Sequence, residues 1–98
     1  MPDSSSNDLW SSVKVAERLV ALRLALDLNK ADFADQIGID RSSYTKIEKG
    51  QKPLLVREAS EIWRLYGVDM NYIYLGQIVG LPGILSSKVI KNLKTPHE

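Results

Sequence analysis

The stretch "KADFADQIGIDRSSYTKIEKG", residues 30–50, decides the fold. It reads as two short helical segments, 30–37 and 41–49, on either side of a break at Gly38. Glycine adopts the left-handed backbone conformation that ends a helix and turns the chain sharply. The stretch therefore predicts two short helices joined by a tight turn.

The apolar residues of this stretch are few and regularly spaced, and they are Phe33, Ala34, Ile37, Ile39, Tyr44 and Ile47. Ala34 is small where two crossing helices approach each other, and Ile39 is placed to anchor the turn in a core. Tyr44 and Ile47 lie three residues apart and define the inward side of helix 41–49. The other side of that helix is polar, and its N-terminal half is expected to face solvent.

Helical periodicity extends through much of the chain. The expected helices are 13–26, 30–37, 41–49, 55–66 and 70–75. Each is bounded by a capping residue or a glycine, namely Ser12, Asn29, Asp40 and Asp69 at the starts and Gly38, Gly50, Gly67 and Gly76 at the ends. Nothing alternates with the period of a strand. We predict an all-α fold of four or five helices.

Polar and broken segments flank this helical region. Residues 1–11 are rich in Ser, Asp and Asn, so we expect disorder there. We expect a helix-turn-helix domain over residues 12–76 and a tail over 77–98. The tail is interrupted by glycine and proline, and Ser86 or Ser87 is a possible start of a short basic helix.

Composition excludes several classes of protein. The 98 residues suit one domain, and the absence of cysteine excludes disulfides and cysteine-based zinc sites. No apolar run is long enough for a membrane span, and the polar N-terminus does not resemble a signal peptide, so we expect a cytoplasmic protein. The single histidine, His97, is next to last, and Asp32 and Asp35 are expected to be solvated. We therefore predict no catalytic residues, metal site, cofactor or small-molecule ligand.

Positive charge is concentrated after residue 40. The net charge is only +1, but Arg41, Lys46, Lys49 and Lys52 follow closely with a single acid, Glu48, among them. A local basic stripe can bind a polyanion even when the whole domain is nearly neutral. The alternative is an ordinary solvated helix face.

Residues 18–76 resemble the Cro and phage-repressor family of helix-turn-helix proteins, also called XRE-like. The matching stretches are "RLVALR" (18–23), "FADQIGI" (33–39), "SSYTKIEKG" (42–50) and "YGVDMNYIYLG" (66–76). The resemblance implies a compact lambda-repressor-like domain that binds double-stranded DNA. It also implies a transcription regulator, specifically a repressor, of phage or bacterial origin.

The resemblance assigns roles to individual residues. Helix 41–49 would enter the major groove, and the residues facing base edges would be Arg41, Ser42, Thr45 and Lys46. The residues near phosphates would be Asn29, Lys30, Ser43, Lys49 and Lys52. Glu48 would anchor the helix through Arg18 or Arg23.

The resemblance also implies a homodimer, because one recognition helix reads few base pairs and two half-sites lie about one helical turn apart. Candidate interface residues are Tyr72, Tyr74, Val20 and Leu24; Ile73 fits a core position better. Val13, Ala16, Val20 and Leu24 form an apolar stripe on the first helix. The tail segment 78–85 or a second subunit would cover this stripe, unless its members are scattered surface residues.

A second function remains open from the sequence. The near-neutral charge and the apolar stripe also suit a helical protein-interaction module or an antitoxin-like partner built on the same fold. Salt-dependent binding to duplex DNA would distinguish the two functions.

Overall fold

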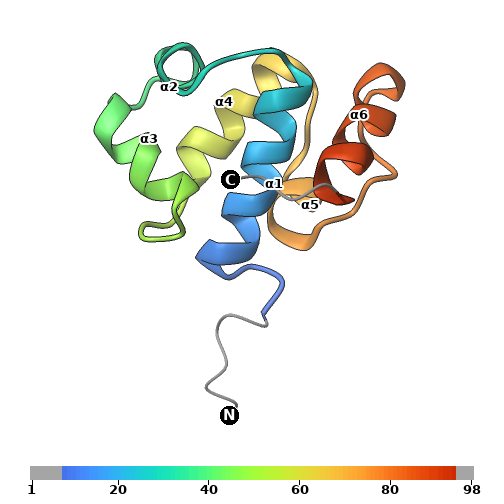
Figure 1. Cartoon of the computed structure of the whole chain (residues 1–98), viewed down its shortest axis with the longest axis horizontal. Coiled ribbons are helices and arrows are strands. Elements are labelled where there is room, and N and C mark those ends of the chain that lie inside the picture. The colour runs from blue at the N-terminus through green and yellow to red at the C-terminus, as the bar shows by residue number, and fades with distance from the viewer. Residues whose placement is uncertain (1–7, 95–98) are drawn as a thin grey trace.

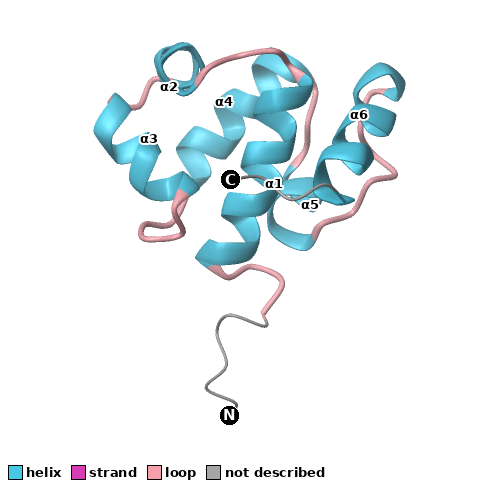
Figure 2. Ribbon diagram, viewed as in Figure 1, coloured by secondary structure: helices cyan, strands magenta, loops and turns pink. Residues whose placement is uncertain are grey.

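The computed structural model of the chain describes residues 8–94, which form helices joined by loops and contain no strand (Figure 2). The helices in this part of the chain are α1 (Ser12–Ala25), α2 (Lys30–Ile37), α3 (Arg41–Glu48), α4 (Val56–Tyr66), α5 (Met70–Leu75) and α6 (Gly83–Lys94). The predicted all-α class is confirmed. The five helices expected up to Gly76 form as α1–α5. The basic helix suggested at Ser86 or Ser87 forms as α6, which begins earlier, at Gly83.

Most of these helices begin where a short polar side chain accepts a hydrogen bond from a backbone amide three residues ahead. Asn29 and Asp40 do so as predicted, from the amides of Asp32 (2.8 Å) and Ser43 (3.0 Å). At α1 the cap is Ser11, one residue before the predicted Ser12, and its Oγ accepts from the Lys14 amide. The caps therefore determine where the helices start along the chain.

Helix α4 starts differently, because Leu55 precedes it and has no polar side chain. The carboxylate of Glu58, in the first turn, accepts from the Leu55 amide at 2.9 Å. Glu58 is buried. The acidic side chain thus satisfies a backbone donor that the N-cap residue would otherwise leave unpaired.

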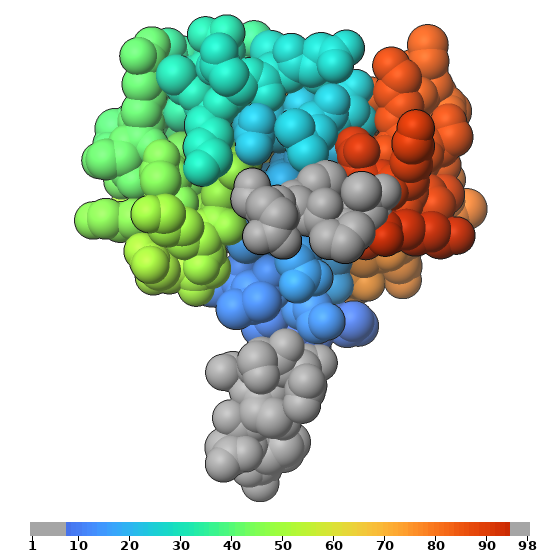
Figure 3. Space-filling model, in the orientation of Figure 1, coloured from blue at the N-terminus to red at the C-terminus, as the bar shows by residue number. Residues whose placement is uncertain are grey.

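Helix α1 runs through the middle of the molecule and separates two groups of helices (Figure 1). Helices α2 and α3 pack against each other, and α3 also contacts α1. Helix α6 packs along another face of α1, and α5 contacts both α1 and α4. The α2–α3 pair and α6 therefore lie at opposite edges of the domain (Figure 3).

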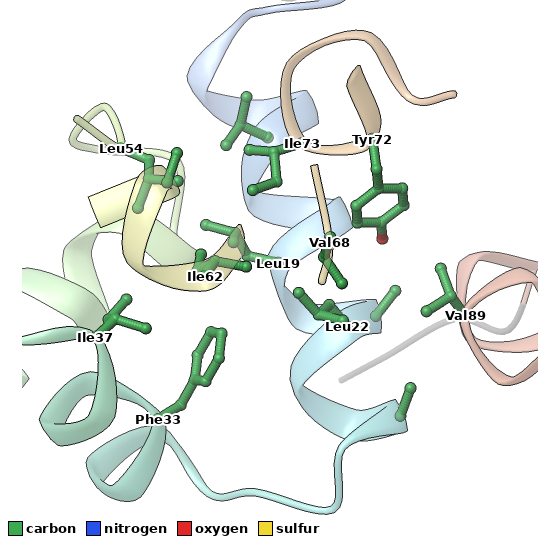
Figure 4. Close-up of a cluster of buried hydrophobic side chains, with 14 of the residues drawn as sticks. Leu19, Leu22, Phe33, Ile37, Leu54, Ile62, Val68, Tyr72, Ile73 and Val89 are labelled. Atoms are coloured by element: carbon green, nitrogen blue, oxygen red, sulfur yellow. The ribbon is translucent and has the colours of Figure 1, made fainter. Parts of the chain in front are cut away.

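The core forms where α1 meets the surrounding helices (Figure 4). Every described helix contributes at least one buried apolar side chain, and fully buried examples are Leu19, Leu22, Phe33, Ile37, Tyr44, Ile62, Tyr72, Ile73 and Val89. Tyr44 and Ile47 are buried as predicted, and Ile39 packs partly buried against the core. Burial of these side chains is the main favourable term in folding.

The segment after Gly76 belongs to the same core. Leu81, Leu85 and Val89 are buried in it, and the Asn92 amide donates to the Ala21 carbonyl at 3.0 Å. The folded unit therefore extends past the predicted domain end at Gly76.

The expected cover of the α1 stripe by residues 78–85 or by a second subunit stays a prediction. Within that segment Val79 and Ile84 point outward, with exposed fractions of 94% and 80%. Leu81 and Leu85 of the same segment are buried in the core, and helix α6 contacts α1. Of the stripe, Ala16 is buried and Val20 is half-buried, whereas Val13 and Leu24 are exposed.

Residues 8–11 have defined structure, contrary to the disorder expected over 1–11. The Ser11 amide donates to the Asp8 carbonyl at 3.1 Å, and the Leu9 carbonyl accepts from the buried guanidinium of Arg18 at 2.6 Å. These bonds anchor the segment to α1. The rest of that prediction, residues 1–7, and the prediction for His97 lie outside the described residues.

No helix within residues 8–94 has the length and apolar character needed to cross a membrane.

Candidate nucleic-acid interface

The turn between α2 and α3 sets the angle at which α3 leaves the domain. Gly38 has a φ of +78°, in the left-handed region, and the Ile39 amide donates back to the Ala34 carbonyl at 3.0 Å. Beneath the turn, the rings of Phe33 and Tyr44 meet edge to face, with centroids 5.4 Å apart and planes at 82°. The two helices are thus held together by the backbone turn and by an aromatic contact.

A charged cluster fixes the other end of α3 to α1. Arg23 Nε donates to Glu48 Oε2 at 2.7 Å and Arg23 Nη2 donates to Glu48 Oε1 at 3.2 Å. Tyr44 Oη donates to the same Oε2 at 2.5 Å. Of the two arginines predicted as partners of Glu48, Arg23 is therefore the one that binds it, and Arg18 instead donates to backbone carbonyls.

Burial shapes the ionisation of this cluster. The Glu48 side chain is 3% exposed and that of Arg23 is 11% exposed. Burial lowers the pKa of the Arg23 guanidinium, but the hydrogen bonds and charge of Glu48 outweigh it, so the pKa is raised overall. Burial, reinforced by the Glu48 charge, raises the pKa of the Tyr44 hydroxyl well above its usual range. Arg23 stays charged and Tyr44 stays neutral at ordinary pH.

The predicted base-reading residues lie on the solvent side of α3. Arg41, Ser42 and Lys46 are exposed and Thr45 is half-buried. Ser42 Oγ donates to Asp40 Oδ2 at 2.7 Å, and Thr45 Oγ1 donates to the Arg41 carbonyl at 3.0 Å. These side chains therefore share an accessible surface that is rich in hydrogen-bonding groups.

Arg41 forms an ion pair with the preceding helix. Its Nη2 donates to Asp35 Oδ2 at 2.6 Å and its Nε donates to Asp35 Oδ1 at 3.2 Å. The Arg41 hydrogen bond lowers the pKa of the Asp35 carboxyl, and the same bond raises the pKa of Arg41. Both side chains are more than half exposed.

The predicted phosphate-contacting residues lie at the start of α2, on α3 and just after α3. Asn29 and Lys30 are exposed at the start of α2, and Lys49 is exposed just after α3. Lys52 Nζ donates to Ser43 Oγ at 2.9 Å, which holds the loop after α3 against the helix. Residues of α2, α3 and this loop occupy one edge of the molecule in Figure 3.

Asp40 is the acidic residue closest in sequence to this surface. Its carboxylate accepts from the Ser42 hydroxyl and from the Ser43 amide, and these bonds hold its pKa far below the usual range. The carboxylate is therefore fully charged at neutral pH and is engaged in capping α3.

The predicted assignment of Tyr72 to a dimer interface must be corrected. Tyr72 is fully buried, and its Oη donates to the Arg18 carbonyl at 2.7 Å, so it has no surface for a partner. Helix α5 is so short that either side of it could have faced the core, and it buries Tyr72 together with Ile73. Tyr74 and Val20 are half-buried, and Leu24 is exposed.

The residue that sequence reasoning missed is Asp35, which was expected to be merely solvated. Asp35 lies three residues before Gly38 and Arg41 lies three residues after it. Opposite charges placed symmetrically about a tight turn come together when the helices cross. This spacing is a signal that can be read from sequence.

Comparison with known proteins agrees with this geometry. A family model described as helix-turn-helix matches residues 19–73, which include all of α2, α3, α4 and their connections. Neither the curated proteins nor the solved structures contain a match to the chain. The matched region covers more than half of the chain, and it contains the turn, the buried anchors and the exposed helix described above. The chain therefore belongs to the helix-turn-helix family of DNA-binding regulators of the Cro and phage-repressor type.

Proposed function

We propose that the protein is a sequence-specific transcription regulator that reads the DNA major groove with α3. The observation that carries this proposal is the division of α3 into two sides. One side is anchored by Tyr44, Ile47 and the buried Arg23–Glu48 pair. The opposite side exposes Arg41, Ser42 and Lys46 with half-buried Thr45, which are side chains able to bond base edges. A recognition helix needs this combination, because rigid placement makes the base contacts selective.

Phosphate contacts would set the register of α3 in the groove. We assign them to Asn29, Lys30, Ser43, Lys49 and Lys52. Cations beside the reading surface, which we define as Arg41, Ser42, Thr45 and Lys46, raise the affinity for any duplex without selecting a sequence. When they neutralise phosphates they release counterions from the DNA, so binding weakens as salt rises. This local charge compensates for a net charge of only +1.

Repression is the regulatory direction we propose. A domain bound over a promoter blocks access by occupancy, whereas activation requires a further surface that recruits the transcription machinery. The proposal also assigns the protein to a phage or bacterium and to the cytoplasm, where it would meet the DNA.

We infer that the protein binds DNA as a homodimer. A single short helix specifies only a few base pairs, and a pair of helices one DNA turn apart multiplies the specificity. Tyr74, Val20 and Leu24 stay as candidate interface residues. Leu9 and Trp10 are exposed and add apolar surface near these candidates. Leu9 lies close to α5, because the Arg18 guanidinium donates both to the Leu9 carbonyl and to the Ile73 carbonyl of α5.

The test is selection of bound duplexes from a random pool, followed by titration of the selected duplex at several salt concentrations. We expect a defined preferred sequence and a steep loss of affinity as salt rises. Lys52→Ala should weaken binding to all duplexes similarly and reduce the salt slope by about 1. The alternative function, a protein-interaction module or antitoxin-like partner, predicts weak binding with no sequence preference at any salt concentration.

A further inference from the structure

Asp35 engages one particular edge of the Arg41 side chain. The bonds run from Nε and Nη2, the two nitrogens on the side of the guanidinium, to the two oxygens of the carboxylate. This fork-to-fork arrangement is the most directional form of an arginine–carboxylate pair. It crosses the turn, since Asp35 lies on α2 and Arg41 begins α3.

The pair restricts how Arg41 can bind a further acceptor. A guanidinium has five N–H donors in a fixed plane, and the bonds to Asp35 occupy the side edge. The donors that remain lie on Nη1 and Nη2, at the end of the side chain. Guanine presents O6 and N7 as two adjacent acceptors in the major groove, which match this end-on pair of donors.

We propose that Asp35 is a specificity-determining residue, which holds Arg41 so that its end-on donors are committed to a guanine. This inference rests on the proposed function. Asp35 also adds negative charge close to a surface that would meet phosphates, so it disfavours DNA binding in general. Asp35 therefore lowers the affinity for all duplexes and raises the discrimination between base pairs.

A structural role alone is a weak explanation for this pair. The side chains of Arg41 and Asp35 are 64% and 53% exposed. Exposed ion pairs contribute little to folding, because solvent and salt screen them. The pair also lies within the surface assigned to DNA, because Arg41 is one of the base-reading residues and begins α3.

The test compares two variants that remove the same charge. Asp35→Asn keeps the shape of the side chain but cannot accept both Arg41 bonds. Asp32→Asn is the matched control, because Asp32 is also exposed on α2 and acts on Arg41 through its charge, but has no hydrogen bond to Arg41 among those found in residues 8–94. The probes are the duplex selected by the parent protein and three duplexes that change the base pair at which Arg41→Ala loses its preference.

We expect both variants to bind unrelated duplexes up to a fewfold more tightly at low salt, because each loses one negative charge. Only Asp35→Asn should lose discrimination at that base pair, by roughly two- to fivefold, the range expected for an exposed ion pair. Arg41→Ala should lose more, roughly five- to 150-fold. In the Arg41→Ala background, Asp35→Asn should cause no further loss of preference.

Each other outcome has a separate meaning. If the Asp35→Asn and Asp32→Asn variants discriminate equally well at that base pair, the inference is overturned. Asp35 would then act on DNA binding only through its negative charge. No loss of preference in Arg41→Ala would overturn it as well, because Arg41 would then read no base. If the parent protein itself selects no sequence, the proposed function fails and the inference fails with it.

Discussion

Arg23 on α1 donates to both carboxylate oxygens of Glu48 at the end of α3, across 25 residues of sequence. Tyr44 donates to the same carboxylate from one turn earlier in α3. This cluster ties the helix that carries the candidate reading surface to the helix at the centre of the core. The orientation of α3 therefore depends on a buried charge pair as well as on apolar packing.

Replacing Glu48 tests that dependence. Glu48→Gln removes the charge that Arg23 and Tyr44 share and leaves a buried guanidinium without its counterion. We expect the free energy of unfolding to fall by about 3 kcal/mol, as measured by urea denaturation. Glu61→Gln is the control, since the Glu61–Arg64 pair is open to solvent, which screens it, and this substitution should leave stability nearly unchanged. Equal effects of the two substitutions would contradict the anchoring role.

The segment after Gly76 offers a matched pair of valines, one buried and one exposed. Val89 of α6 is fully buried against the core, whereas Val79, in the loop before the helix, is 94% exposed. We expect Val89→Ala to lower the free energy of unfolding by about 1–3 kcal/mol and Val79→Ala to change it by less than about 0.5 kcal/mol. A single unfolding transition in both variants would show that α6 unfolds together with the rest of the domain. If Val89→Ala matches Val79→Ala, α6 does not belong to the cooperative unit.

Gly38 carries the turn because of its backbone conformation alone. A Cβ at this position would meet no other atom within 4 Å, but the φ of +78° is strained for most other residues. Gly38→Ala should therefore lower the free energy of unfolding by about 1 kcal/mol. Gly38→Asn should lower it less, because asparagine tolerates the left-handed region. The order of the two variants in thermal or urea unfolding tests this cause, and the reverse order would rule it out.

Acid should weaken the cap of α3. The folded-state pKa of Asp40 lies far below its ordinary value of 3.8, so its contribution to stability is present above that value. The contribution is lost as the pH falls from about 4 toward the folded-state pKa. Asp40→Asn keeps a good capping side chain but removes this titration. We expect its unfolding free energy to fall less between about pH 4 and about pH 2 than that of the parent. Identical pH profiles would contradict the assignment.

The part of the fold that could be predicted from sequence depends on local signals. Asn29, Gly38 and Asp40 act on residues within one turn of themselves, so the boundaries of α2 and α3 follow from their positions. The inward placement of Tyr44 and Ile47 follows from helical spacing in the same way. The reading surface is what remains once these roles have been assigned.

The features that sequence reasoning missed depend on contacts between distant segments. Helix α6 begins at Gly83, directly after Gly80 and Pro82, and these three residues suggest a loop. The helix packs on α1, and its Leu85 and Val89 are buried in the core. In a helix as short as α5, the sequence does not show whether Tyr72 faces inward or outward. Its inward position depends on α1, where the Arg18 carbonyl accepts the Tyr72 hydroxyl. In both cases the missing information was the arrangement of helices in space. The Asp35–Arg41 pair is different, because its symmetric spacing about Gly38 could have been read from the sequence.

The central claim, that α3 reads DNA, is tested most directly by mapping backbone amide chemical-shift changes as the selected duplex is added to the protein. We predict the largest changes at residues 41–46, with further changes at 29–30 and 49–52. Amides of α6, at the opposite edge of the domain, should change little (Figure 1). Changes concentrated on α6 or around the exposed Val13 and Leu24 of α1, with residues 41–46 unaffected, would contradict the claim.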